Sequence, residues 1–198
     1  MLFIFDSDLN VVDTLSNEGS INDVTTFYDD EYYKNVASGA ETYTFKTLAG
    51  SDEAENLIVG NYIAFRDNKG DYKLFDIINV EETHDENFEK TVYCEMNGIE
   101  LLNDIVRPTN LNNCNVEKLA KYILAETNWE LGYIDDFADN LDISIDSHIK
   151  AYNAIQQYIV GEFGVEIYFT IEMSGNKVTH KYLNIVEKRG NDAGYRFS

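Results

Sequence analysis

The stretch Gly60–Asp104, GNYIAFRDNKGDYKLFDIINVEETHDENFEKTVYCEMNGIELLND, decides the fold of this chain. It holds three strand-like runs, at residues 62–66, 72–80 and 91–96. Asp67-Asn68-Lys69-Gly70 joins the first two and is a strong hairpin signal, because glycine adopts positive φ without steric cost. The stretch carries no pattern typical of catalysis. It predicts an all-β module followed, from about Leu101, by a change of architecture.

Strand-like runs also precede this stretch, at residues 2–5, 11–15, 24–28 and 42–48. In the last of these runs, Tyr43 and Phe45 fall on one face, which is the period-two pattern of a half-buried strand. Turn residues separate the runs, and residues 51–55 suit one helical turn. Several strands at near-regular spacing predict a small barrel or sandwich. We expect the hairpin and the strand ending at Cys94-Glu95 to close a barrel.

Helical periodicity appears only after these strands. One apolar face, with Asn115 as its candidate N-cap, is formed by Val116, Leu119, Ala120, Ile123 and Leu124. A second helix is predicted over 147–163, capped by Ser147 and ended by Gly164. Strands at 165–171 and 178–186 follow, joined by a turn at Gly175-Asn176.

The fold class predicted from this order is α+β. We expect a β-barrel-like domain over residues 1–97, with residues 186–198 as candidates to complete it, and an α+β domain over residues 98–185. Residues 187–198 hold three of the 15 basic residues and no stop-like structure. We therefore expect either the front end of a longer protein or a last strand that returns to the first domain.

The charge balance excludes one class of partner. The chain has 36 acidic and 15 basic residues, a net charge of −21, whereas binding to nucleic acid requires basic residues that neutralise phosphates. The charge suits a soluble surface, or an acidic wall past which DNA slides without sticking. No apolar run approaches the ~18 residues that span a bilayer, and MLFIFDSDLN lacks the features of a signal peptide. We expect no membrane span, and synthesis and retention in a cytoplasm or exit by another route.

Candidate chemistry is weak throughout the chain. Cys94 and Cys114 are too few for a disulfide framework, so two buried free thiols are favoured over a single bridge. The histidines His84, His148 and His180 lie far apart and form no metal motif. We therefore expect no metal site, no cofactor and no catalytic residue.

Two features have a sharper alternative reading. Two groups of acids are interpreted as solvated acidic faces: Asp29-Asp30-Glu31, and the set Asp135, Asp136, Asp139, Asp142 and Asp146. For the second group, the alternative is a set of hydrolase carboxylates or calcium ligands. Trp129 is interpreted as part of the core of the second module rather than as a sugar-stacking platform.

Four passages together resemble a known family by their order and spacing. They are Phe3-Ile4-Phe5-Asp6 with Leu9-Asn10-Val11-Val12; Gly60-Asn61-Tyr62-Ile63 with Phe75-Asp76-Ile77, Tyr93-Cys94-Glu95 and Glu100-Leu101; Asn128-Trp129-Glu130-Leu131-Gly132; and Ala154-Ile155 with Phe163-Gly164-Val165-Glu166-Ile167 and Lys188-Arg189-Gly190. The chain resembles the N-terminal hub region of phage and prophage tail proteins, the prophage endopeptidase tail family of long-tailed phages.

The resemblance implies a structural, non-enzymatic role in the virion tail. Such proteins resemble the baseplate hub and form a homotrimer that closes the tail tube, with a tail-tube-related β-barrel domain and an outer α/β domain. The implied partners are the distal tail, tail tube and tape measure proteins, assembly takes place in the host cytoplasm, and DNA passes through the ring. Any cell-wall hydrolase activity is implied to lie C-terminal to this region. The alternatives are a peptidoglycan hydrolase using residues 135–146, or a carbohydrate- or receptor-binding module using exposed Tyr and Trp side chains.

Overall fold

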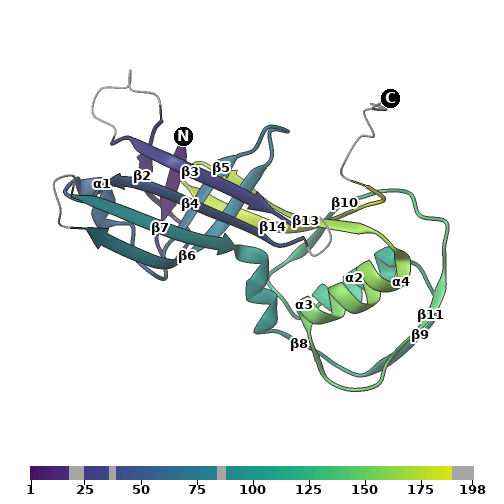
Figure 1. Ribbon diagram of the computed structural model, residues 1–198. Helices are drawn as coiled ribbons and strands as arrows, with labels where there is room; N and C mark the ends of the chain where they lie inside the picture. Colours follow the sequence, from purple (N-terminus) through teal and green to yellow (C-terminus); the bar gives the residue numbers. More distant parts are fainter. Residues whose placement is uncertain (18–24, 36–38, 84–87, 189–198) are drawn as a thin grey trace, which may run out of the picture. The chain divides into compact units, whose positions relative to one another are not determined.

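The computed structural model describes residues 1–17, 25–35, 39–83 and 88–188, and is mostly β-sheet with few helices (Figure 1). The chain forms two compact units. The first comprises Met1–Asn35, Ala40–Ile99 and Phe169–Lys181, and the second comprises Val36–Gly39, Glu100–Tyr168 and Tyr182–Ser198. No helix in the described ranges is long and apolar enough to cross a membrane. Residues 189–198, most of the segment predicted to complete the barrel, lie outside the described residues.

An antiparallel sheet forms the first unit, in the order β2-β1-β5-β6-β7-β4-β3. Its elements are β1 Leu2–Phe5, β2 Val11–Leu15, β3 Phe27–Lys34, β4 Glu41–Leu48, α1 Asp52–Glu55, β5 Tyr62–Arg66, β6 Tyr72–Thr83 and β7 Glu89–Met96. Figure 1 shows β3, β4, β7 and β6 as neighbours in that order. The hairpin predicted at Asp67–Gly70 joins β5 and β6, and Gly70 takes the positive φ of 91° that the turn requires.

The predicted barrel is not closed in the described part of the chain. Its two terminal strands, β2 and β3, meet only at an isolated parallel bridge between Ser16 and Thr26. Two backbone bonds make this bridge: Ser16 N donates to Thr25 O at 3.1 Å and Phe27 N donates to Ser16 O at 3.1 Å. Strand β3 then bulges at Tyr28–Glu31, where Asp29 has a φ of 50°, and this irregularity interrupts its ladder with β4.

Aromatic rings pack against the buried face of this sheet. Alternate residues of β4 and β7 point inward, as the period-two pattern predicts. The rings of Phe65 and Phe75 stack with centroids 5.3 Å apart, and Tyr43 lies 4.7 Å from Phe65. Such contacts add about 0.5–1.5 kcal/mol per pair beyond the burial of area. Ring contacts therefore add to the stability of a core that also contains buried aliphatic side chains such as Ile63 and Ile77.

A buried ion pair crosses the same sheet. Glu41 on β4 and Lys73 on β6 are 3% and 2% exposed, and their charged atoms lie 3.7 Å apart. Lys73 Nζ also donates to the carbonyl of Phe169 at 2.8 Å, and the Tyr32 hydroxyl donates to Glu41 at 2.6 Å. Buried charges are tolerated only when paired and hydrogen-bonded, so these contacts fix the positions of several strands relative to one another.

The second unit combines helices with short strands. Its elements are η1 Asn97–Leu102, which begins in the first unit, then β8 Ile105–Val106, β9 Thr109–Cys114, α2 Val116–Leu124, β10 Glu130–Ile134, β11 Leu141–Ile145, β12 Ile149–Lys150, α3 Ala151–Ala154, η2 Ile155–Val160 and α4 Gly161–Phe163. The strands β13 Glu166–Ser174 and β14 Lys177–Val186 contribute residues to both units. β9 pairs with β11, β8 with β12, and β10 runs parallel to β14.

One helix follows its prediction closely and the other does not. The helix α2 begins after Asn115, whose side chain accepts a bond from Lys118 N at 2.9 Å, as expected of an N-cap. The predicted helix over 147–163 instead begins at Ala151, so Ser147 is not its cap. Residues 149–150 pair with β8 first, and the helix then passes through a π-helical turn, η2. Gly164 ends it at a φ of 64°, as predicted.

Candidate binding pocket and the predicted site residues

The acidic residues between Asp135 and Asp146 are engaged in local structure. Asp135 accepts from the Tyr133 hydroxyl at 2.8 Å and from Glu187 N at 2.9 Å. The bond from Glu187 N, followed by that from Tyr133, holds the pKa of Asp135 below its ordinary value. A general acid requires the opposite shift, so Asp135 is suited to fixing the backbone rather than to donating a proton.

Two further acids of this group also accept hydrogen bonds from nearby groups. Asp142 accepts from Asn113 N at 2.8 Å, which links β11 to β9, and Asp146 accepts from the Ser144 hydroxyl at 2.7 Å. Asp136 and Asp139 are exposed. These contacts favour the interpretation of a solvated, structure-supporting acidic face over a hydrolytic one.

Trp129 lies in the core of the second unit, which confirms the sequence interpretation. Its side chain is 3% exposed, and Nε1 donates to the carboxylate of Glu100 at 2.6 Å. A ring that is buried on both faces has no surface on which a sugar could stack. The proposed role of Trp129 in carbohydrate binding is therefore not supported by its position.

Cys94 and Cys114 are both free and buried, as expected. Burial raises the pKa of each thiol, so neither has the lowered pKa of a catalytic cysteine. Within the described ranges, His, Cys, Asp and Glu residues form no group of three that could hold a metal ion. His84 lies outside the described residues.

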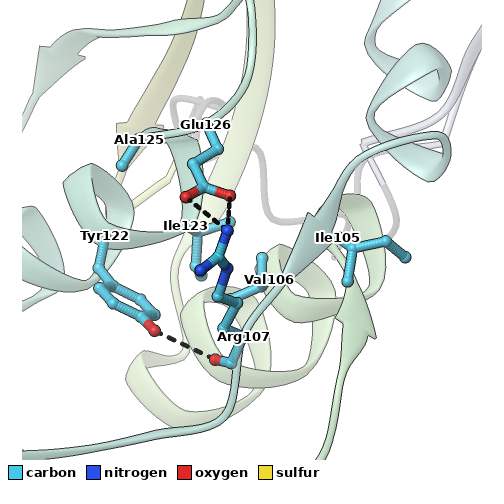
Figure 2. A pocket seen from close by; sticks show the side chains of 7 residues that line it. All are labelled: Ile105, Val106, Arg107, Tyr122, Ile123, Ala125 and Glu126. Atoms are coloured by element: carbon cyan, nitrogen blue, oxygen red, sulfur yellow. Dashed lines mark hydrogen bonds and ion pairs between the residues drawn. The ribbon is translucent and has the colours of Figure 1, made fainter.

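A small hollow lies on the second unit between β8 and α2 (Figure 2). Its volume is about 70 Å³, room for a few water molecules. Arg107 forms an ion pair with Glu126 at 3.2 Å, and the Tyr122 hydroxyl donates to the Arg107 carbonyl at 3.1 Å. Figure 2 shows these groups directed at one another. Because their hydrogen bonds and charges are already paired within the hollow, they are not well suited to bind a ligand.

A larger cavity of about 310 Å³ lies in the first unit, and we call it the β3/β5 pocket. Aromatic residues and polar or charged residues line it together with Met1 and Leu2: Phe27, Tyr32, Tyr43, Phe65, Asn17, Asp30, Arg66, Asp67 and Asn68. This volume is at the lower end of the range for ligand pockets. Sequence reasoning did not identify the pocket, because its walls come from strands far apart in the chain. The mixture of aromatic and acidic residues in FYDDEYYK was the available signal.

Sequence comparison finds no known family profile that matches this chain, and no curated protein that does. Its fold, however, is similar to that of solved tail proteins and of a secretion-system protein. One is an E. coli component of the type VI secretion system, described as structurally similar to the T4 bacteriophage tail proteins gp27 and gp5 (TM-score 0.54, 12% identity, 90% of this chain and 50% of that chain).

Two further solved structures are similar to this chain. Prophage tail protein gp18 from Listeria monocytogenes matches with a TM-score of 0.54 at 13% identity, over 92% of this chain and 50% of that chain. A tail protein from Neisseria meningitidis matches with a TM-score of 0.51 at 12% identity, over 79% of this chain and 44% of that chain. The chain thus has a tail-related fold and spans about half the length of these proteins.

Proposed function

We propose that this chain is a structural component of a phage or prophage tail tip, a baseplate-hub-like protein that closes the tail tube and links it to the host-facing tip. The observation that carries the proposal is the similarity of fold to two tail-related proteins over about nine-tenths of the chain. The local structural bonds of the acids at 135–146 are consistent with a role without catalysis.

The proposed assembly is a homotrimeric ring that contacts the distal tail, tail tube and tape measure proteins. Sedimentation velocity of the purified chain over a range of concentrations tests this proposal. The expected species has three times the 22.7 kDa mass of one chain, and electron micrographs should show a ring. A chain that stays monomeric at every concentration, both alone and mixed with the distal tail protein, contradicts the ring.

We further propose that acidic residues face the opening through which DNA passes. The net charge of −21 supports this, because a negatively charged wall avoids the phosphate contacts that would retard the DNA. Mapping of the acids in a structure of the assembled ring is the test. The proposal fails if the acids lie only on the outer surface of the ring.

Incorporation into tail particles separates this function from the peptidoglycan hydrolase alternative. Immunogold labelling of purified virions should place the chain at the end of the tail, and zymography on cell walls should give no clearing. Cell-wall clearing that disappears in an Asp142→Asn variant would support the hydrolase instead.

A further inference from the structure

The β3/β5 pocket lies where the sheet fails to close. The wall formed by β1 and β5 includes Leu2 and Phe65, which are register partners, and the wall formed by β3 and β4 includes Tyr32 and Tyr43, which are also register partners. Between these walls, among the residues that the structure describes, β2 and β3 are paired only at the bridge from Ser16 to Thr26. Interior rings that a closed barrel would cover therefore line a cavity instead.

The rings in this pocket have surface available for a ligand. Tyr32 is 38% exposed and Phe65 is half-buried, with their rings packed edge to face at 5.5 Å. The faces of aromatic rings carry partial negative charge and attract cations within about 6 Å of the ring centroid. The walls of the pocket are thus suited both to the apolar stem and to the charged end of a long basic side chain.

Carboxylates and basic groups line the pocket together. The carboxylates are those of Asp30 and Asp67, and the basic groups are the guanidinium of Arg66 and the α-amino group of Met1. The guanidinium is already engaged, because its Nε donates to Gly70 O at 2.7 Å and its central carbon lies 5.4 Å from the centre of the Tyr72 ring. Asp67 is partly committed to its turn, accepting from Lys69 N and Asp71 N.

Asp30 is the acid best placed to bind a ligand. The Tyr43 hydroxyl donates to Oδ2 of Asp30 at 3.0 Å and so orients the carboxylate. Burial, followed by the neighbouring charge of Asp30, raises the pKa of Tyr43, so this hydroxyl stays a donor over the whole physiological range. Asp30 is exposed, and its Oδ1, which accepts no bond from the described residues, can accept one from water or from a ligand.

We propose that the β3/β5 pocket binds the cationic end of a lysine or arginine side chain presented by another protein. The stem of that side chain would lie against Tyr32 and Phe65, and its charge would pair with Asp30. A protein partner with an exposed basic segment is also the natural complement of a chain with a net charge of −21. This inference does not depend on the proposed function.

The test is an NMR titration of the whole chain with Nα-acetyl-arginine methylamide and Nα-acetyl-lysine methylamide. Amide shifts should be confined to residues that line the pocket, with a Kd on the order of 1 mM. The neutral analogue Nα-acetyl-norleucine methylamide should shift the same amides at least several times more weakly. Equal binding of the neutral analogue, or shifts spread over the acidic surface, would overturn the proposal.

An Asp30→Asn variant isolates the charge. Asparagine keeps an oxygen for the Tyr43 hydroxyl, so the unfolding midpoint should stay unchanged while binding weakens roughly two- to fivefold. Asp139→Asn is the matched control, because Asp139 is exposed in the second unit and its replacement removes the same single negative charge. If the two variants bind the probes equally well, attraction to the overall charge explains the binding and the pocket does not.

Discussion

The two units of this chain are stabilised in different ways. In the first unit, rings from several strands share the core with aliphatic side chains, and Glu41 and Lys73 form a buried ion pair. In the second, aliphatic side chains of α2 and of the helix from α3 to α4 form the core with Trp129, and the ion pairs, such as Lys121 with Glu117, lie on the surface. Ring packing and buried charges depend on accurate strand positions, whereas aliphatic cores tolerate repacking. Single substitutions should therefore have larger effects in the first unit.

Removal of a central ring should give the largest effect. Phe75 is fully buried and stacks on Phe65, so Phe75→Ala should lower the free energy of unfolding by about 3–5 kcal/mol. Tyr33→Ala is the matched control, because Tyr33 is 57% exposed, and it should cost less than about 0.5 kcal/mol. Hydrogen exchange of β5, β6 and β7 in urea measures both effects.

The single tryptophan of the chain reports which unit responds. Trp129 lies in the second unit, so its fluorescence follows that unit alone. If Phe75→Ala shifts the fluorescence midpoint as far as it shifts hydrogen exchange in β6, the two units unfold together and the contrast in their stability disappears.

Breaking the buried ion pair should rank second. Lys73→Met leaves the carbonyl of Phe169 without this donor and Glu41 without this cation, which should cost about 3 kcal/mol. Lys121→Met is the control in the second unit, where the partner Glu117 lies at 2.6 Å but both side chains are exposed. It should cost no more than about 0.5 kcal/mol. Equal losses in urea unfolding would show that burial of the pair does not matter.

A smaller effect is expected from the polar contact in the second core. Trp129→Phe keeps an aromatic ring but removes the bond from Nε1 to Glu100, which should cost about 1–3 kcal/mol. Circular dichroism during heating measures the loss, since this variant has no tryptophan to report. A double variant that also carries Glu100→Gln tests the contribution of the charged hydrogen bond. If that bond contributes, the loss of stability in the double variant should be smaller than the sum of the losses in the two single variants.

The same contrast explains which elements the sequence predicts. β5 has its predicted bounds, and α2 begins after its predicted N-cap and buries all five residues predicted for its apolar face, because those residues recur along one side of the helix. β3 runs to Lys34, well beyond the predicted 24–28, because five of the eight residues of FYDDEYYK are exposed, three of them acidic, and the segment lacks the alternation of a half-buried strand. β9 and β11 were missed for a similar reason, since few of their residues are buried.

The candidate site was harder to predict than the fold. Asp30 and Phe65 line one pocket because strand pairing brings β3 and β5 close together although they are not neighbours in the sheet, with the rings of Tyr32 and Phe65 5.5 Å apart. No local pattern encodes that arrangement, which results from the pairing of strands distant in sequence. The burial of Trp129 was predictable because tryptophan side chains are highly buried on average.

The smallest expected effect concerns two aspartates of the second unit whose pKa values are shifted in opposite directions. Backbone and side-chain bonds, first from Glu187 N, lower the pKa of Asp135 from its ordinary 3.8, whereas burial, then the charge of Glu100, raises that of Asp104. The stability that Asp135 contributes is present above pH 3.8 and lost as pH falls through its folded pKa. The contribution of Asp104 is present below 3.8 and lost as pH rises through its folded pKa.

Carboxyl NMR titration of the whole chain measures both groups. Asp104 should titrate above Asp135, and Asp135→Asn should make the unfolding midpoint of the second unit less sensitive to acid. Asp139→Asn, an exposed control in the same unit, should leave that sensitivity unchanged. Since the surface acids of the second unit act through individual contacts, their effects should add, whereas those of Glu41 and Lys73 in the first unit should not. Coupling between Asp104 and Asp135 would remove this last distinction between the two units.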